Sequence, residues 1–141
     1  MHPPELGVAD VLGPIPAAIV FILLMSALRE PARRNFNAIF VAGAGAAYLS
    51  GGLGVWELPY VAVAAGVAYL GLRSHVWIGV AWLMHTTWDI VHHAYADPIW
   101  PFMPTSSAGC AVFDAVIAIW FLAGAPSVFD RRRQTSLQPS S

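Results

Sequence analysis

Five apolar stretches, separated by short polar or charged segments, constrain the fold of this chain more than any other feature. They occupy residues 11–28, 36–56, 58–72, 76–95 and 108–129. A helix needs about 20 mostly apolar residues to cross the hydrocarbon core of a bilayer, and about 17 to 25 are tolerated. The third stretch is shorter, so local thinning of the bilayer or flanking residues must meet its ends. The pattern predicts an all-α fold, an integral membrane bundle of five transmembrane helices.

The composition supports a chain embedded in the lipid bilayer. Charged residues make up 11% of the sequence and hydrophobic residues 57%, whereas about a quarter of the residues of a soluble domain are charged. The net charge of −1, without an extended basic patch, argues against a nucleic-acid partner. The single cysteine, Cys110, excludes an intramolecular disulfide and a zinc–thiolate site. We expect one transmembrane domain over residues 1–133 and a disordered polar tail at 134–141.

The distribution of basic residues tests the number of crossings. With five crossings, all seven basic residues, which are all arginines, fall on one side of the membrane. They are Arg29, Arg33 and Arg34 after the first stretch, Arg73 after the third, and Arg131, Arg132 and Arg133 after the fifth. Because basic loops stay in the cytoplasm, the sequence predicts an outer N-terminus and a cytoplasmic C-terminus. Four or six crossings would divide the arginines between the two sides.

The fourth stretch ends in HTTWDIVHH, residues 85–93, which places several ionisable side chains inside a predicted span. A central Asp in a membrane helix costs roughly 2.5 to 3.5 kcal/mol on insertion scales. At about 100° per helical residue, Asp89 lies about 40° from His85, and His92 about 20° to the other side. These three side chains therefore form one polar stripe, with His93 at its edge.

Asp114, in the fifth stretch, lies at the same predicted depth as Asp89. With a rise of about 1.5 Å per residue, each lies about 9 Å below the outer end of its helix. Consecutive elements are usually neighbours in space, and Glu57, at the outer start of the third stretch, is placed to cover the same region. The sequence predicts a His/Asp pocket facing the outer side.

Our leading hypothesis is a metal site in this pocket. Imidazole and carboxylate are common ligands of Zn²⁺, Fe²⁺ and Mn²⁺, and a bound cation would offset the cost of burying the acids. His85, Asp89 and His92 are the expected direct ligands, and His93 and Asp114 are either ligands or residues that orient them. The spacing H-x3-D-x2-H-H differs from the H-E-x-x-H motif of metalloproteases.

The pattern leaves the chemistry of the site open. In an enzyme, the metal would activate water or oxygen against an apolar substrate that enters from the lipid, with Asp114 as the candidate general base. The alternative is a non-catalytic transporter-like or sensory module in which the His/Asp cluster binds a ligand or relays protons. Five helices lack the paired repeats of many transporters, so transport would require a homo-oligomer. The third interpretation is a structural clamp between the fourth and fifth helices.

The connector ADPIWPFMPTSS, residues 96–107, has a proline at every third position from Pro98 to Pro104. This spacing favours a stiff, extended segment, which is either a rigid interfacial connector or a lid over the outer pocket. Thr105, Ser106 and Ser107 are expected to cap the fifth helix.

The stretch HHAYADPIWPFMPTSSAGCAVFDAVIAIWFLAGAPS, from His92 to Ser127, resembles an uncharacterised family of small bacterial multi-pass membrane proteins, catalogued as a domain of unknown function. The resemblance extends over most of the chain. It implies a location in the bacterial inner membrane, with the lipid bilayer as partner, and brings no known activity, cofactor or substrate.

Overall fold

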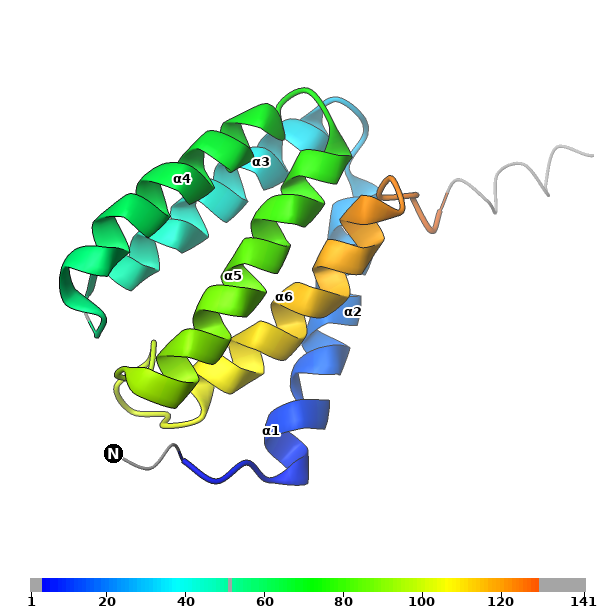
Figure 1. The fold of residues 1–141 in the computed structure, drawn as a ribbon. Coiled ribbons are helices and arrows are strands. Elements are labelled where there is room, and N and C mark those ends of the chain that lie inside the picture. The colour runs from blue at the N-terminus through cyan, green and yellow to red at the C-terminus, as the bar shows by residue number, and fades with distance from the viewer. Residues whose placement is uncertain (1–3, 51, 130–141) are drawn as a thin grey trace, which may run out of the picture.

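The computed structural model describes residues 4–50 and 52–129, and within these ranges the chain is all helical, without a strand. This confirms the predicted all-α class. The helices are α1 (Val8–Leu12), α2 (Pro14–Ala27), α3 (Ala32–Gly45), α4 (Glu57–Leu70), α5 (His75–Tyr95) and α6 (Ser106–Leu122), and the short 3₁₀ helices are η1 (Ala46–Ser50) and η2 (Gly54–Trp56) (Figure 1).

These helices form consecutive segments that run alternately up and down the bundle (Figure 1). The first segment is α1 with α2, the second is α3 with η1, the third is η2 with α4, and α5 and α6 are the last two. The most extensive contact joins α5 to α6, while α2 packs on α6 and α3 pairs with α4. Helix α5 therefore lies at the centre, where its polar residues face several neighbours.

Two predicted helix boundaries were wrong at their ends. The second helix begins at Ala32 and ends at Gly45, and the chain then tightens into η1 instead of continuing to residue 56. The fifth helix ends at Leu122 and not at residue 129. Gly124 and Ala125 adopt positive φ angles of 86° and 48°, and their amides bond back to the last carbonyls of α6, as in left-handed helix caps.

The connector between α5 and α6 is not extended as its prolines predicted. The Met103 amide donates to the Trp100 carbonyl at 2.9 Å, which closes a turn. The hydroxyls of Ser106 and Ser107 accept from the amides of Trp100 (3.0 Å) and Ile99 (3.3 Å). The two serines thus fix the connector rather than cap α6, since local hydrogen bonds from serine compete with regular structure.

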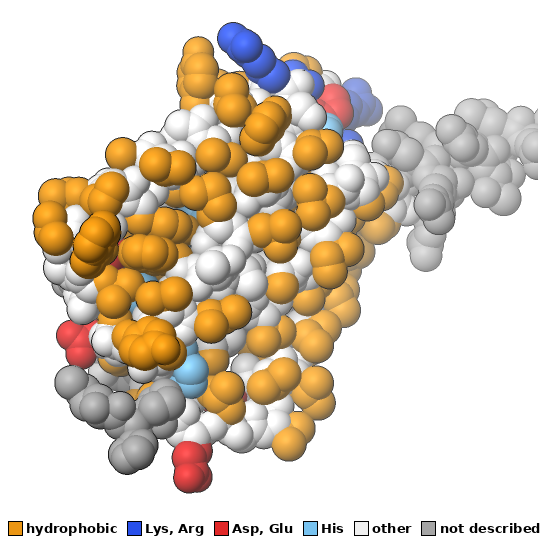
Figure 2. Space-filling model, in the orientation of Figure 1, with side chains coloured by type: hydrophobic (Ala, Val, Ile, Leu, Met, Phe, Trp, Pro, Cys, Tyr) orange, Lys and Arg blue, Asp and Glu red, His pale blue; other side chains and the backbone are white. Residues whose placement is uncertain are grey.

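One described helix, Val8–Ala27, is long and apolar enough to cross a membrane, and Gly54–Leu70 and Ser106–Leu122 are shorter apolar helices. The surface carries many large apolar side chains, which Figure 2 shows over the sides of the bundle. Basic side chains gather at one end in the same view, and acidic ones lie at both ends. Five crossings and their orientation remain predictions, and Arg131, Arg132, Arg133 and the tail at 134–141 lie outside the described residues.

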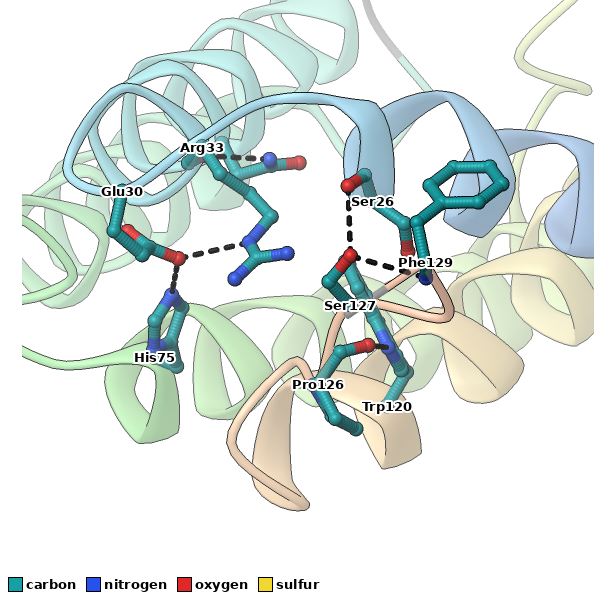
Figure 3. A network of polar contacts seen from close by, with 9 residues as sticks. Ser26, Glu30, Arg33, His75, Trp120, Pro126, Ser127 and Phe129 are labelled. Atoms are coloured by element: carbon teal, nitrogen blue, oxygen red, sulfur yellow. Dashed lines mark hydrogen bonds and ion pairs between the residues drawn. The ribbon is translucent and has the colours of Figure 1, made fainter. Parts of the chain in front are cut away.

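A network of polar contacts links several helices at the end of the bundle where the basic side chains gather, called the arginine end below (Figure 3). Glu30, in the turn between α2 and α3, contacts Arg33 Nε at 2.8 Å and His75 Nε2 at 2.9 Å, so it links α3 to the start of α5. The Ser127 hydroxyl donates to the Ser26 carbonyl at 2.9 Å, and Trp120 Nε1 donates to the Pro126 carbonyl at 3.1 Å (Figure 3). The segment after α6 is therefore anchored to α2.

Candidate functional site

The centre of the site is a pair of buried aspartates on α5 and α6. Asp89 is 0% exposed and Asp114 5%, and their carboxyl groups lie close enough to form a hydrogen bond. Such a bond needs a proton on one of the two carboxyls, because an ionised carboxylate only accepts. The prediction that these residues lie at one level on neighbouring helices is confirmed.

Tyr48 is the third member of this group, and sequence reasoning missed it. Its hydroxyl donates to Asp89 Oδ1 at 2.6 Å, a length typical of a strong hydrogen bond from O–H to a carboxyl oxygen. The 3₁₀ helix η1 carries Tyr48, and the residue is buried. The available signal was a lone aromatic hydroxyl directly after a run of small residues, AGAGAA at 42–47.

His85 lies one helical turn before Asp89 and is buried. Its side chain bonds to the backbone of Val41 on α3, while Nε2 has no hydrogen-bond partner. Among the described residues, no nitrogen or hydroxyl donor reaches Asp89 Oδ2, and a proton on Asp114 is the donor available to it. Buried polar groups are nearly always hydrogen-bonded, and the unpartnered His85 Nε2 therefore indicates a place for a ligand.

His92 points to α4 and not to Asp89. Its Nε2 lies 2.9 Å from Glu57 Oε1, and both side chains are almost fully buried. Glu57 also accepts from Trp88 Nε1 at 2.9 Å and from the Leu53 amide at 3.1 Å. The predicted position of Glu57 beside the cluster is thus observed, but it forms a separate buried contact with His92.

His93 is half-buried and lies near α1, where its charge acts on Asp10. Asp10 itself accepts from the Thr105 hydroxyl at 2.7 Å. The predicted set of metal ligands is therefore divided between the aspartate pair, Glu57 and α1. Within residues 4–50 and 52–129, no group of three or more His, Cys, Asp or Glu side chains is placed to hold a metal ion, and the metal site remains a prediction.

A cavity of about 660 Å³ leads to the aspartate pair. Small and aromatic residues of α1, α2, α3 and α6 form most of its wall, and the connector residues Ile99, Trp100 and Met103 line it as well. Its polar members on α5, α6 and η1 are Tyr48, His85, Asp89, Cys110 and Asp114, and α1 adds Asp10. The connector thus lies where the predicted lid was expected.

The lining of the cavity is exposed on the side of the bundle and also at the end formed by α1 and the connector. Among its lining residues, Ala17 on α2 and Phe40 on α3 are exposed, and both lie within helices rather than at their ends. Helices α2 and α3 pack mainly on other partners, although the rings of Phe21 and Phe40 approach to 5.7 Å. This opening would face lipid if the bundle spans a bilayer.

The fold and the site together define an all-helical protein with a buried carboxyl pair at the end of an apolar side cavity. The chain belongs to the protein family of unknown function DUF6010, whose family model matches residues 9–127. No curated protein and no solved structure matches the chain. The expected membership of an uncharacterised family is confirmed, whereas the bacterial and multi-pass parts of that expectation remain predictions.

Proposed function

We propose that this protein is a five-span protein of the bacterial inner membrane that binds an amphipathic small molecule taken from the bilayer. It is the non-catalytic alternative of the sequence analysis, a transporter-like or sensory module built on the His/Asp cluster. The observation that carries the proposal is the 660 Å³ cavity that opens on the side of the bundle and ends at Asp89 and Asp114.

The surface of the bundle supports a position within the membrane. Large apolar side chains on its sides are exposed, among them Ile39, Val63 and Ile119 with exposed fractions of 68%, 58% and 66%. Monomeric soluble proteins rarely expose extended apolar patches. The turn between α2 and α3, which contains Arg29, and the turn between α4 and α5, which contains Arg73, lie at the same end of the bundle (Figure 1), consistent with a cytoplasmic face.

The lining of the cavity supports an amphipathic ligand. Ligand pockets are typically apolar with a few convergent polar groups that orient the ligand. The walls formed by Ala17, Phe40 and Phe113 would contact the apolar part of the ligand. Its polar group would lie against His85 Nε2 and Asp89 Oδ2. Among the described residues, neither atom accepts a hydrogen bond from a nitrogen or hydroxyl donor.

Equilibrium binding to the protein in lipid nanodiscs tests the proposal. The probes are single-chain decyl amphiphiles, with empty nanodiscs subtracted. We expect saturable binding of one molecule per chain, and its loss in Ala44→Trp, since the indole would fill the cavity that Ala44 lines. The control is Ala65→Trp on the exposed side of α4, outside the lining.

Two results would overturn the proposal. The first is the absence of saturable binding for every head group tested. The second is unchanged binding in a folded Ala44→Trp protein, because the probe would then occupy another surface. Retained binding in Ala65→Trp together with loss in Ala44→Trp would support the cavity as the site.

A further inference from the structure

We infer that the ligand of this cavity is an organic cation, a lipophilic amine or quaternary ammonium whose charged nitrogen lies against the Asp89–Asp114 pair. The inference rests on the proposed function and names the ligand class of the same cavity. It depends on the charge of the lining, on its aromatic content and on the hydrogen bonds of the pair.

The ionisable lining of the cavity is acidic. Asp10, Asp89 and Asp114 line it, and none of the described arginines does. The Tyr48 hydroxyl is neutral, so it gives Asp89 a hydrogen bond but no countercharge. A buried charge is costly unless it is paired. The pair therefore either keeps its protons or receives a cation from outside the protein.

Aromatic rings surround the same space. Phe40, Tyr48, Trp82, Trp100 and Phe113 line the cavity. Ammonium groups are attracted to the faces of aromatic rings, and quaternary ammonium ligands are commonly bound in aromatic cages. An anionic ligand would instead meet three acids, against which the lining offers the single imidazole of His85. The lining is thus complementary to a cation with an apolar chain.

The cation needs no proton to leave the pair. A hydrogen bond between the Asp89 and Asp114 carboxyls takes a proton on one of them, and the other can remain a carboxylate. When an ammonium enters, it pairs with this carboxylate and the proton stays on the partner carboxyl. No covalent bond forms or breaks, and the positive charge of the ligand offsets the negative charge of the pair.

Other ionisable groups also lie around the pair. Those facing the cavity or its neighbouring rings come from each adjoining element: Asp10 on α1, Tyr48 on η1, Tyr60 and Glu57 on α4, His85 and His92 on α5, and Cys110 on α6. Asp89 and Asp114 are two acids of the lining that lie within reach of each other. We therefore expect the charged nitrogen of the ligand to lie at this pair.

The test compares three head groups on one chain length in nanodiscs: decyltrimethylammonium, decanol and decanesulfonate. We expect the ammonium to bind at least tenfold more tightly than decanol, and the sulfonate more weakly than both.

The isosteric double variant Asp89→Asn/Asp114→Asn removes the charge and keeps the shape. We expect its affinities for decyltrimethylammonium and decanol to agree within about twofold, with an unchanged circular dichroism spectrum as evidence of a folded protein. The matched control is Asp97→Asn, an exposed acid beyond the end of α5 and outside the lining, which should keep the tenfold preference.

The outcomes separate this inference from the proposed function. If decanol binds as tightly as the ammonium in the unmodified protein, the cation inference fails and the binding function stands. If no probe binds, both fail. A preference that persists in the double variant also overturns the inference, as does stoichiometric binding of Zn²⁺ or Mn²⁺ that is lost in this variant without any preference for the ammonium.

Discussion

Asp89 has few partners for a buried acid. Its contacts are the Tyr48 hydroxyl and the Asp114 carboxyl, and its side chain is fully buried. Leaving one buried acceptor without its donor costs about 1 to 3 kcal/mol. Tyr48 therefore stabilises the site as well as the fold, because its hydroxyl holds the Asp89 carboxyl that lines the cavity.

Replacing Tyr48 by phenylalanine tests this single hydrogen bond. We expect Tyr48→Phe to lower the free energy of unfolding by about 1 to 3 kcal/mol, since Asp89 Oδ1 loses its donor. Denaturant-induced unfolding in mixed micelles measures the effect. Tyr69→Phe is the control, because Tyr69 is 63% exposed and exposed substitutions usually change stability by less than about 0.5 kcal/mol. Equal effects of the two substitutions would contradict this role of Tyr48.

The His92–Glu57 contact shows that the partner of a polar side chain cannot be assigned without the fold. Helical phase puts His92 near the stripe of His85 and Asp89, yet its ring nitrogen lies 2.9 Å from Glu57. The neighbouring ring of Tyr48, 5.2 Å away, occupies the space beside Asp89. Which acid a histidine faces depends on the neighbouring helices as well as on its own position.

At the level of helices, α5 and α6 approach each other closely at Gly79. A Cβ atom at this position would lie 2.8 Å from Leu122 Cγ and 3.0 Å from the Leu122 backbone nitrogen. Small residues let membrane helices approach closely, and this contact holds together the two helices that carry Asp89 and Asp114.

A matched pair of glycine substitutions tests this contact. We expect Gly79→Ala to destabilise the protein by about 1 to 3 kcal/mol, because overpacking moves a side chain or the backbone. Gly66→Ala on α4 should be neutral or stabilising, since no atom lies within 4 Å of its added Cβ and alanine favours helix. Thermal unfolding compares the two variants. A Gly79→Ala protein as stable as Gly66→Ala would contradict close packing.

The polar network at the arginine end depends on an ionised Glu30 (Figure 3). Partial burial opposes ionisation, but the hydrogen bonds and charges of Arg33 and His75 outweigh it, so the pKa of Glu30 lies below its ordinary value of 4.5. A carboxyl with a lowered pKa contributes stability above its ordinary pKa, and the contribution is lost as pH falls through the lowered value.

The Glu30→Gln variant should therefore differ from the unmodified protein only where this carboxyl is ionised. We expect a loss of at most about 1 kcal/mol near neutral pH, as for other partly exposed ion pairs. The difference should vanish as the pH falls below 4.5. Unfolding measured across this range checks it, with exposed Glu5→Gln as control. A difference that grows on acidification would contradict the assignment.

At the scale of the whole molecule, the proposed five crossings place the two ends of the bundle on opposite sides of the membrane. The turn between α4 and α5, which contains Ser74, lies at one end of the bundle, and the connector between α5 and α6, which contains Asp97, lies at the other (Figure 1). In a Cys110→Ala background, an impermeant thiol reagent should label Asp97→Cys in cells whose outer membrane is permeabilised. It should label Ser74→Cys only after the inner membrane is disrupted. Labelling of both sites before disruption would contradict the topology.

The sequence by itself determined the all-helical class, the bounds of α5 to within one residue, and the common level of Asp89 and Asp114. These follow from local regularities, since a rise and rotation per residue place side chains along a helix and between antiparallel neighbours. The sequence did not predict that the helices end at Gly45 and Leu122. The tightening into η1 and the left-handed cap after α6 depend on how the ends of these segments pack.

Only the tertiary structure decided what surrounds the aspartate pair. Tyr48 reaches Asp89 because η1 continues α3 past the centre of the bundle, and His93 turns toward α1 because α5 presents it to that side. The cavity exists because α2 packs on α6 while α3 packs on α4 and α5. Its volume is the space that several helices leave unfilled between them. It therefore cannot be predicted from any one segment of the sequence.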